Sequence, residues 1–587
     1  MALRRGVGLV LSLIALAVIV SMAALALMFL VVSRAPSVPS SATLVLRPGG
    51  DLTEIQADDV VGQVFGRETP TVRGFVEALG KARRDPRVRT VLLMPSTLQL
   101  PFWGKVQELR DAILDFRRSG KTVIAFLEYG GDREYYLASA ADRVFLLPTS
   151  LLDLTGVASY EIFLRGSLDK LGAYPDFVHI GDYKTGPNQY TEKGFTPEHR
   201  EMTQSLNRDM YEQLVKGIAE SRKKTEAEVR DLLDRGPLVA AEALEAGLVD
   251  ELAYEDQLDD RVPDLAEDGA SRIEGREYQR VSPESIGVRP RSRIAVLYAV
   301  GTIVSGRSSF DLLNGSLVGS DTIVEQLRKI RDDDQVKAIV LRIDSPGGSS
   351  VASDVIWREL MITREEKPSR PLVTSMSDLA ASGGYYIAIP GEAIVAQPAT
   401  LTGSIGVYAG KIVIGGSLDK IGAAGEAVTS GANADIYSPF APFTPGQRAK
   451  IGMYMQGFYD DFVAKVAQSR KATPDQIRAV ARGRVWTGRQ ALEHGLVDAL
   501  GGLDTAVAIA KERAHIPADE DVQLVVYPAR RSLYDVLSQE FGGASGVGLW
   551  NILAGGTERR AVAALSAPVR LFRRGEPLAL MPFTFVR

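Results

Sequence analysis

Cysteine is absent from this chain and histidine is scarce, and these two shortages exclude several kinds of chemistry. Among 587 residues there are no cysteines and only four histidines. Disulfides, thiolate metal sites and cysteine nucleophiles are therefore excluded. Four scattered histidines also disfavour a zinc site and a Ser-His-Asp triad. We expect no metal and no cofactor, and nucleophilic chemistry would have to use other side chains.

An excess of positive charge is also lacking. The chain has 68 lysines and arginines against 73 acidic residues, which gives a net charge of −5. With no extended basic stripe either, we expect no nucleic-acid partner.

The length exceeds what one hydrophobic core usually supports, so two or more domains are expected.

One long hydrophobic run is present, at the N-terminus. After Arg4 and Arg5, residues 6–33 carry no charge and consist mostly of Leu, Val, Ala and Ile. About 20 apolar residues cross a bilayer, whereas the apolar part of a cleaved signal peptide usually has about 7–15. We therefore predict a retained, single-pass anchor in the inner (cytoplasmic) membrane, with a cleaved signal peptide as the alternative. The two arginines favour a cytoplasmic N-terminus, which leaves the rest of the chain on the periplasmic, extracytoplasmic side.

The remainder of the chain carries the same pattern twice. The pair Y-Y at 135–136 recurs at 385–386, 250 positions later, and S-L-D-K-L-G at 167–172 recurs as S-L-D-K-I-G at 417–422. In both copies, apolar runs typical of buried parallel strands alternate with helical spacing, which predicts an α/β fold from an internal duplication. We predict four parts: the anchor and linker at 1–41, a first repeat at 42–285, a second repeat at 286–520, and a tail at 521–587 that we do not assign beyond one strand at 522–527.

The two copies have lost opposite chemical groups. Ser382, in A-S-G-G-Y-Y, corresponds to Asp132 of the first copy, and Lys184, in G-D-Y-K-T-G, corresponds to Ala434 of the second. A serine nucleophile needs a base, and a lysine can be that base if burial lowers its pKa. We therefore predict one composite site from both copies, and we expect neither copy to be active alone. Other serines near these motifs compete with Ser382: Ser345, Ser349, Ser375 and Ser377.

A glycine turn in the second copy is suited to stabilising an oxyanion. D-S-P-G-G-S at 344–349 directly follows an apolar strand, and Gly347 and Gly348 leave backbone N–H groups without side-chain cover. Gly383, next to Ser382, can offer its own N–H. The corresponding loop of the first copy, at 94–99, has no glycine. The simpler interpretation is that the two glycines only form a structural turn. Because the first copy has no glycine at this place, we favour a functional role for the turn.

With these residues in place, the chain resembles the serine-lysine peptidases of the signal peptide peptidase A family, within the Clp-protease and crotonase-like group. The motifs D-S-P-G-G, A-S-G-G-Y-Y, T-G-S-I-G-V and G-D-Y-K-T-G stand where that family places them, over roughly residues 42–520. The resemblance is to the long form and implies two tandem Clp-protease/crotonase-like domains behind a transmembrane helix. One departure is Asp344, where family members often have asparagine.

The resemblance also implies roles for individual residues. Ser382 would be the nucleophile and Lys184 the general base, while Ser404 would orient the lysine amine. Gly348 (or Gly347) and Gly383 would supply the oxyanion N–H groups. The implied enzyme is a membrane-anchored serine endopeptidase that degrades remnant signal peptides and forms a homo-oligomer, for instance a tetramer. Two alternatives stay open: a non-catalytic membrane scaffold, since the first copy has lost its nucleophile, and an acyl-CoA-binding enzyme of the crotonase type.

Overall fold

The structure is a computed structural model that describes residues 16–17, 19–20, 37–55, 70–265, 271–311, 315–529, 578–581 and 585–586. Within these ranges no helix is both long and apolar enough to cross a membrane. The apolar run at 6–33, for which we predict the anchor, lies almost wholly outside the described residues.

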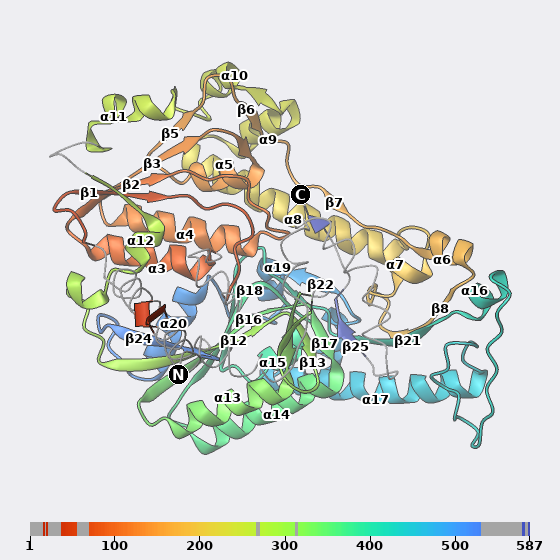
Figure 1. The fold of residues 1–587 in the computed structure, drawn as a ribbon. Coiled ribbons are helices and arrows are strands. Elements are labelled where there is room, and N and C mark those ends of the chain that lie inside the picture. Colours follow the sequence, from red (N-terminus) through yellow and green to blue (C-terminus); the bar gives the residue numbers. More distant parts are fainter. Residues whose placement is uncertain are drawn as a thin grey trace, which may run out of the picture.

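The first repeat is built on a sheet whose strands are all parallel, in the order β10-β5-β3-β2-β1-β11. Figure 1 shows this sheet in the upper part of the molecule, with α3 and α4 on the side that faces the second repeat. Its elements are β1 (Ala42–Leu46), α3 (Val72–Arg84), β2 (Val88–Leu93), α4 (Gly104–Arg118), β3 (Thr122–Leu127), α5 (Asp132–Ala138), β5 (Arg143–Leu146), β10 (Glu251–Leu252) and β11 (Ser271–Glu274).

The second repeat contains the same arrangement. The path β23-β19-β18-β16-β12-β24 places equivalent strands in the same order, and these pairs are again parallel. Its elements are β12 (Ser292–Val300), α13 (Ser320–Asp332), β16 (Val336–Ser345), α14 (Ser350–Glu366), β18 (Leu372–Ala381), α15 (Gly383–Ala388), β19 (Ala393–Ala396), β23 (Ala499–Leu500), α20 (Leu503–Arg513) and β24 (Val522–Tyr527). The α/β duplication predicted from the sequence is therefore confirmed.

Two long helices also repeat. They are α8 (Pro197–Arg222) and α17 (Pro445–Arg470), each followed by a shorter helix, α9 (Glu226–Arg235) or α18 (Pro474–Val480). Each long helix begins at a threonine whose side chain accepts a hydrogen bond from the backbone, followed at once by proline, and each ends at a lysine with left-handed backbone. Capping threonine and proline are both favoured at helix starts, so these boundaries follow directly from the local sequence.

A third sheet joins the two repeats. Its order is β14-β15-β13-β17-β25-β21-β8. Strand β8 (Tyr174–Ile180) belongs to the first repeat and runs antiparallel to β21 (Val407–Val413) of the second, from Val407 opposite Ile180 to Val413 opposite Tyr174. The other members are β13 (Thr302–Val304), β14 (Ser309–Asp311), β15 (Gly315–Gly319), β17 (Gly347–Ser349) and β25 (Leu578–Leu580). The repeats therefore share a sheet, and the site described below lies along it.

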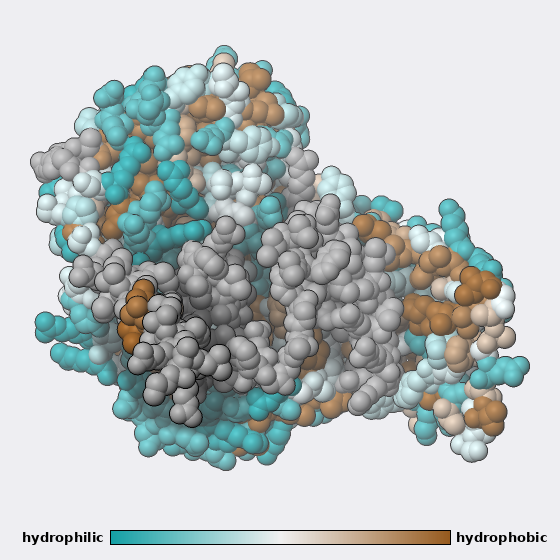
Figure 2. All heavy atoms as spheres, in the orientation of Figure 1, coloured by the Kyte–Doolittle hydropathy of each residue, from teal (hydrophilic) through white to brown (hydrophobic). Residues whose placement is uncertain are grey.

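Hydrophobic side chains gather on the surface at one end of the molecule. In Figure 2 this brown area lies on the right, where Figure 1 places α6 (Arg165–Leu171), β8 and α16 (Gly415–Lys420). The exposed hydrophobic side chains at these elements include Leu171 of α6, Tyr174 of β8 and Ile421, directly after α16.

Candidate active site

Ser382 lies at a sharp junction between a strand and a helix. Strand β18 ends at Ala381 and helix α15 begins at Gly383, so Ser382 is the single residue between them. Its backbone has φ 55° and ψ −113°, a region that residues other than glycine rarely adopt. Its N–H donates to the Gly403 carbonyl, at 2.8 Å, and its carbonyl accepts from Tyr386 N–H, at 2.8 Å. These two bonds hold the strained turn that presents the hydroxyl, a geometry that also occurs where nucleophilic serines stand between a strand and a helix.

Lys184 reaches this hydroxyl from the other repeat. Its Nζ lies 2.7 Å from Ser382 Oγ, although 198 positions separate the two residues in the sequence. The same nitrogen lies 2.9 Å from both the carbonyl oxygen and the Oγ of Ser404. The structure thus brings together the serine, the lysine and the orienting serine that the sequence analysis singled out.

Burial changes the acid-base character of Lys184. The side chain is fully buried, and burial lowers its pKa well below the usual value for lysine. The physical cause is the loss of hydration of the ammonium form, which disfavours the charged state. A lysine in this state can accept a proton near neutral pH, as a general base must.

The second repeat packs tightly against the loop that carries Lys184. Tyr183 N–H donates to the Arg482 carbonyl, at 2.9 Å. A Cβ on Gly483 would lie 2.4 Å from the backbone nitrogen of Lys184, and Gly483 itself has φ 82°. Only glycine fits at this position, because a side chain would push the lysine away from Ser382.

The glycine turn lies against the start of α15. Gly347 has φ 101° and Gly348 has φ 156°, so both need the freedom of glycine. A Cβ on Gly383 would lie 3.1 Å from Gly348 N, which places the backbones of these two residues side by side. Gly347 N–H already donates to Ser345 Oγ, at 3.2 Å. Of the two turn glycines, Gly348 is therefore the better placed to offer its N–H to a ligand.

The corresponding position of the first repeat has a different chemistry. Asp132 begins helix α5, and its Oδ1 accepts hydrogen bonds from Thr155 N–H, at 3.1 Å, and Gly156 N–H, at 2.9 Å. Burial raises its pKa to about 6. Leu154, which corresponds to Ser404, is fully buried. A carboxyl group occupied by two backbone donors does not reproduce the serine-lysine arrangement.

Two charged residues next to the site, Lys105 and Asp378, were not singled out from the sequence, and Asp344 was noted there only as a departure from the family pattern. Lys105, on α4 of the first repeat, lies with Nζ 2.8 Å from Asp344 Oδ2 and 3.6 Å from Asp378 Oδ2. Its backbone N–H also donates to Asp378, at 2.9 Å. Asp344 precedes the glycine turn and Asp378 lies four residues before Ser382, so one lysine connects both segments. The available signal was the position of both acidic residues, since Asp344 opens the D-S-P-G-G motif and Asp378 lies shortly before Ser382.

Burial and the attraction between opposite charges together set the pKa values in this cluster. Burial would lower the pKa of Lys105, but attraction to Asp344 and Asp378 outweighs it and raises that pKa. Burial raises the pKa of Asp378 to about 6, against the attraction of Lys105. Lys105 is therefore firmly protonated, and it compensates the carboxylates that lie between the two repeats.

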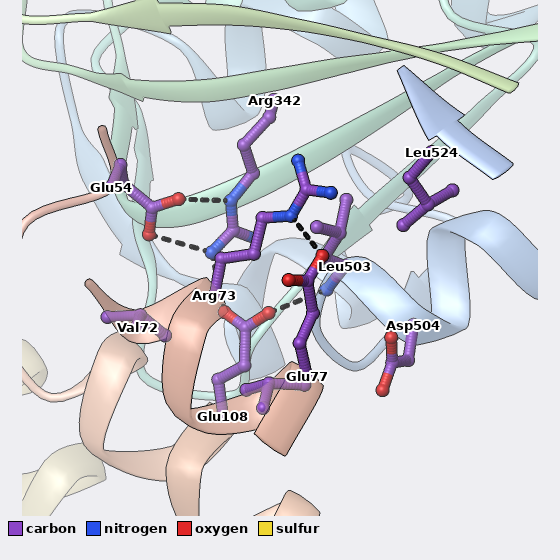
Figure 3. Close-up of a pocket in the computed structure, with 10 residues that line it drawn as sticks. Glu54, Val72, Arg73, Glu77, Glu108, Arg342, Leu503, Asp504 and Leu524 are labelled. Carbon is purple, nitrogen blue, oxygen red and sulfur yellow. Dashed lines mark hydrogen bonds and ion pairs between the residues drawn. The ribbon is translucent and has the colours of Figure 1, made fainter. Parts of the chain in front are cut away.

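A second ionic cluster lies next to the first (Figure 3). Arg342 of β16 is fully buried and forms two hydrogen bonds with Glu54, at 2.8 and 2.9 Å, and one with Glu108, at 2.5 Å. Burial would raise the pKa of Glu54, but attraction to Arg342 lowers it to about 2. Both glutamates belong to the first repeat, so this arginine ties the second repeat to it. The same cluster fixes the competing serines Ser375 and Ser377, which bond to Arg342 and Glu54.

A buried serine and lysine in hydrogen-bond contact, beside a glycine turn, form an arrangement that can activate a serine hydroxyl, as hydrolases require. The model of peptidase family S49 matches residues 115–267 and 364–517. This chain belongs to peptidase family S49, and it is a serine endopeptidase.

Three curated relatives match most of the chain. A chloroplastic serine protease SPPA of Arabidopsis thaliana is 36% identical over 467 residues, which is 78% of this chain and 68% of the relative. Protease 4 of Salmonella typhi is 32% identical over 77% of this chain and 74% of its own length. Protease 4 of Haemophilus influenzae is 29% identical over 84% and 82%.

Proposed function

We propose that this serine endopeptidase works through a catalytic pair in which Ser382 is the nucleophile and Lys184 the general base. One observation carries the proposal: Lys184 Nζ lies 2.7 Å from Ser382 Oγ in a fully buried setting. A serine hydroxyl is a weak nucleophile until a base takes its proton, and the buried, neutral amine is suited to that task.

We infer the positions of the two amine protons of neutral Lys184 from its hydrogen-bond contacts. A neutral amine has two N–H donors and one lone pair. The Ser404 carbonyl, 2.9 Å away, can only accept, so it takes one N–H, and the Ser404 hydroxyl at the same distance takes the other. The lone pair is then directed at Ser382. In this arrangement Ser404 orients the base, and the proton leaves Ser382 along the 2.7 Å contact as Ser382 Oγ attacks a peptide carbonyl.

The attack of Ser382 on the peptide develops a negative charge on the carbonyl oxygen of the substrate. We assign its stabilisation to the N–H groups of Gly348 and Gly383, whose backbones lie side by side. The amine then passes its proton to the leaving nitrogen, and the acyl-enzyme is hydrolysed by a water activated by the same lysine.

The substrates we propose are remnant signal peptides, in keeping with a relative from Enterococcus faecium that is named "Putative signal peptide peptidase SppA". The apolar run at 6–33 supports a single-pass anchor in the inner membrane, with the catalytic part on the periplasmic side. A site tethered there would meet short apolar fragments released from the bilayer.

The domain boundaries and the homo-oligomer are also part of this proposal. The two repeats, at 42–285 and 286–520, would each be a Clp-protease/crotonase-like domain, which the matching strand orders support. The exposed apolar side chains around α6 and α16 would lie in the contact between copies of a homo-oligomer, for instance a tetramer.

Replacement of the nucleophile tests the proposal. Ser382→Ala should reduce kcat/KM for an apolar peptide by a factor on the order of 10⁴ or more, because no oxygen remains to form the acyl-enzyme. A fluorophosphonate probe should add its mass to the peptide that contains Ser382. Ser375→Ala is the matched control: this serine is equally buried but bonds to Arg342, and it should retain turnover and labelling. Undiminished turnover by the Ser382→Ala chain would refute the assignment.

A further inference from the structure

A short segment of the C-terminal tail lies as a strand beside the active site. Residues Leu578–Leu580 form β25, which runs antiparallel to β17 with Gly347 opposite Leu580, Gly348 opposite Ala579 and Ser349 opposite Leu578. On its other side β25 pairs antiparallel with β21, where Tyr408 lies opposite Leu578. The segment is thus an interior strand of the sheet that joins the two repeats, between β17 and β21.

The strands on either side of β25 form a slot one strand wide. In the sheet order, β17 has β13 as its other neighbour and β21 has β8. Adjacent strands lie about 4.8 Å apart, so β17 and β21 stand roughly 10 Å apart with β25 between them. Without β25, both edges would present unpaired N–H and C=O groups to an extended peptide.

This slot runs directly past the catalytic groups. A Cβ on Gly347 would lie 2.0 Å from the Ala579 carbonyl oxygen, and a Cβ on Gly383 would lie 3.2 Å from the same oxygen. On the opposite side, a Cβ on Gly186, two residues after Lys184, would lie 3.5 Å from the Leu580 carbonyl oxygen. The backbone of the tail therefore lies between the proposed oxyanion donors and the lysine loop.

The side chains of the segment fill an apolar surface. Leu578, Leu580 and Tyr408 form a buried cluster, with Phe177 packed against it. Ala579 and Met581 are buried as well, and Met581 N–H donates to the Pro346 carbonyl, at 2.9 Å. In the sequence, L-A-L-M is bracketed by Pro577 and Pro582, which cannot donate to a strand ladder and so limit its length.

We propose that residues 578–581 are a built-in pseudosubstrate that occupies the peptide-binding slot and competes with substrate. The inference rests on the proposed function of this site. It deepens that function in one respect: the slot takes an extended, apolar peptide that pairs antiparallel with Gly347–Ser349. A tethered segment is present at an effective concentration in the millimolar range, so even weak binding would keep most sites filled.

Charged side chains introduced into residues 578–581 should displace this segment from the peptide-binding slot. In the full chain, Leu578→Asp combined with Leu580→Asp should lower KM for an uncharged apolar peptide about tenfold and leave kcat unchanged, because a carboxylate is costly in the apolar cluster. Leu244→Asp is the matched control, since it adds a carboxylate at an exposed leucine of the first repeat and should leave KM as it is. Ala579→Arg, at a fully buried position, is a second variant with the same expected effect. If both tail variants fold but show an unchanged or raised KM, the segment is a structural strand and the proposal is wrong.

A binding measurement separates this inference from the catalytic proposal. The probe is a fluorescein-labelled peptide with the sequence of residues 576–583, E-P-L-A-L-M-P-F, titrated into chains that carry Ser382→Ala. It should bind about tenfold more tightly when Leu578→Asp and Leu580→Asp are also present. Equal affinity for the two chains would overturn the pseudosubstrate. Tighter binding without turnover in any chain that keeps Ser382 would support the slot and refute the peptidase mechanism.

Discussion

At the scale of the residue, the protein depends on a lysine that is kept out of water. Lys184 is fully buried, and the hydrogen bonds of its amine within the described residues go to Ser382 and Ser404. Burial accounts for the lowering of its pKa. Such a group is costly to the fold, and in the proposed mechanism it is useful to the reaction.

The first prediction concerns the pH dependence of turnover. Activity should fall as pH drops through the lowered pKa of Lys184, because the protonated amine cannot accept the Ser382 proton. Lys184→Arg should not restore activity, since arginine stays protonated. The measurement is kcat/KM between pH 5 and 9 for an uncharged peptide. A flat profile would argue against a lysine base.

The second prediction concerns stability and follows from the same shift. Between the lowered pKa of folded Lys184 and the ordinary lysine value of about 10.4, the unfolded chain binds one more proton than the folded chain. Folded stability should therefore rise with pH in this window, by at most about 1.4 kcal/mol per pH unit from this residue. Urea unfolding at pH 7 and pH 9 should show the rise in wild type and its loss in Lys184→Met. Lys216→Met removes an exposed lysine and should keep the rise. The same slope in wild type and Lys184→Met would contradict the argument.

At the scale of the element, two strand ends have to be held in register for the site to exist. Strand β16 leads to the glycine turn and β18 leads to Ser382, and their pairing is irregular between Ile343 and Ser345. Lys105, from α4, binds a carboxylate on each strand, and Leu379 N–H donates to Asp344, at 3.2 Å. A helix of one repeat therefore fixes the catalytic strands of the other.

The third prediction tests this connection. Lys105→Met should lower the free energy of unfolding by about 3–5 kcal/mol, since it leaves two buried carboxylates without their cation. The loss should be larger at pH 8 than at pH 5: without Lys105 the pKa of Asp378, already about 6, should rise further, and protonation at low pH then relieves the unpaired charge. Denaturant unfolding at both pH values measures it, with Lys329→Met, at an exposed lysine, as the control. Equal stability of wild type and Lys105→Met would refute this role.

At the scale of the whole molecule, the repeats form one enzyme because they share a sheet. Strands β8 and β21 pair along their full length, and this pairing places the Lys184 loop over Ser404 and Ser382 of the same chain. The ionic cluster around Arg342 joins the repeats a second time. Each repeat thus supplies part of a site that the other completes.

The fourth prediction follows from this pairing within one chain. Equimolar Ser382→Ala and Lys184→Ala chains, coexpressed and purified together by two different tags, should stay as inactive as either chain alone. Their serine and lysine lie on different molecules, while the 2.7 Å contact joins residues of one chain. Peptide hydrolysis by the doubly purified sample measures this. Recovery to a sizeable fraction of wild-type activity would show that the pair forms between chains.

Much of the fold could be predicted from local pattern. The apolar runs at 88–94 and 336–343 became β2 and β16, and the threonine-proline starts of α8 and α17 follow from helix capping. Residues 371–375 read P-L-V-T-S, which predicts a short strand, but the observed strand β18 continues to Ala381 because its second half is small, buried and paired with β20 (Leu401–Gly403). Such an extension depends on a partner strand that local pattern does not reveal.

By itself, the sequence determined the duplication, the α/β class, and the opposite losses that point to Ser382 and Lys184. These features depend on residue type and on order along the chain, and both can be read directly. Only the tertiary structure decided that Lys105 joins Asp344 and Asp378, and that L-A-L-M lies between β17 and β21. Both contacts connect segments more than 160 residues apart. A buried charge or a strand edge selects its partner by burial and hydrogen bonding in the folded chain, and sequence separation carries no record of that choice.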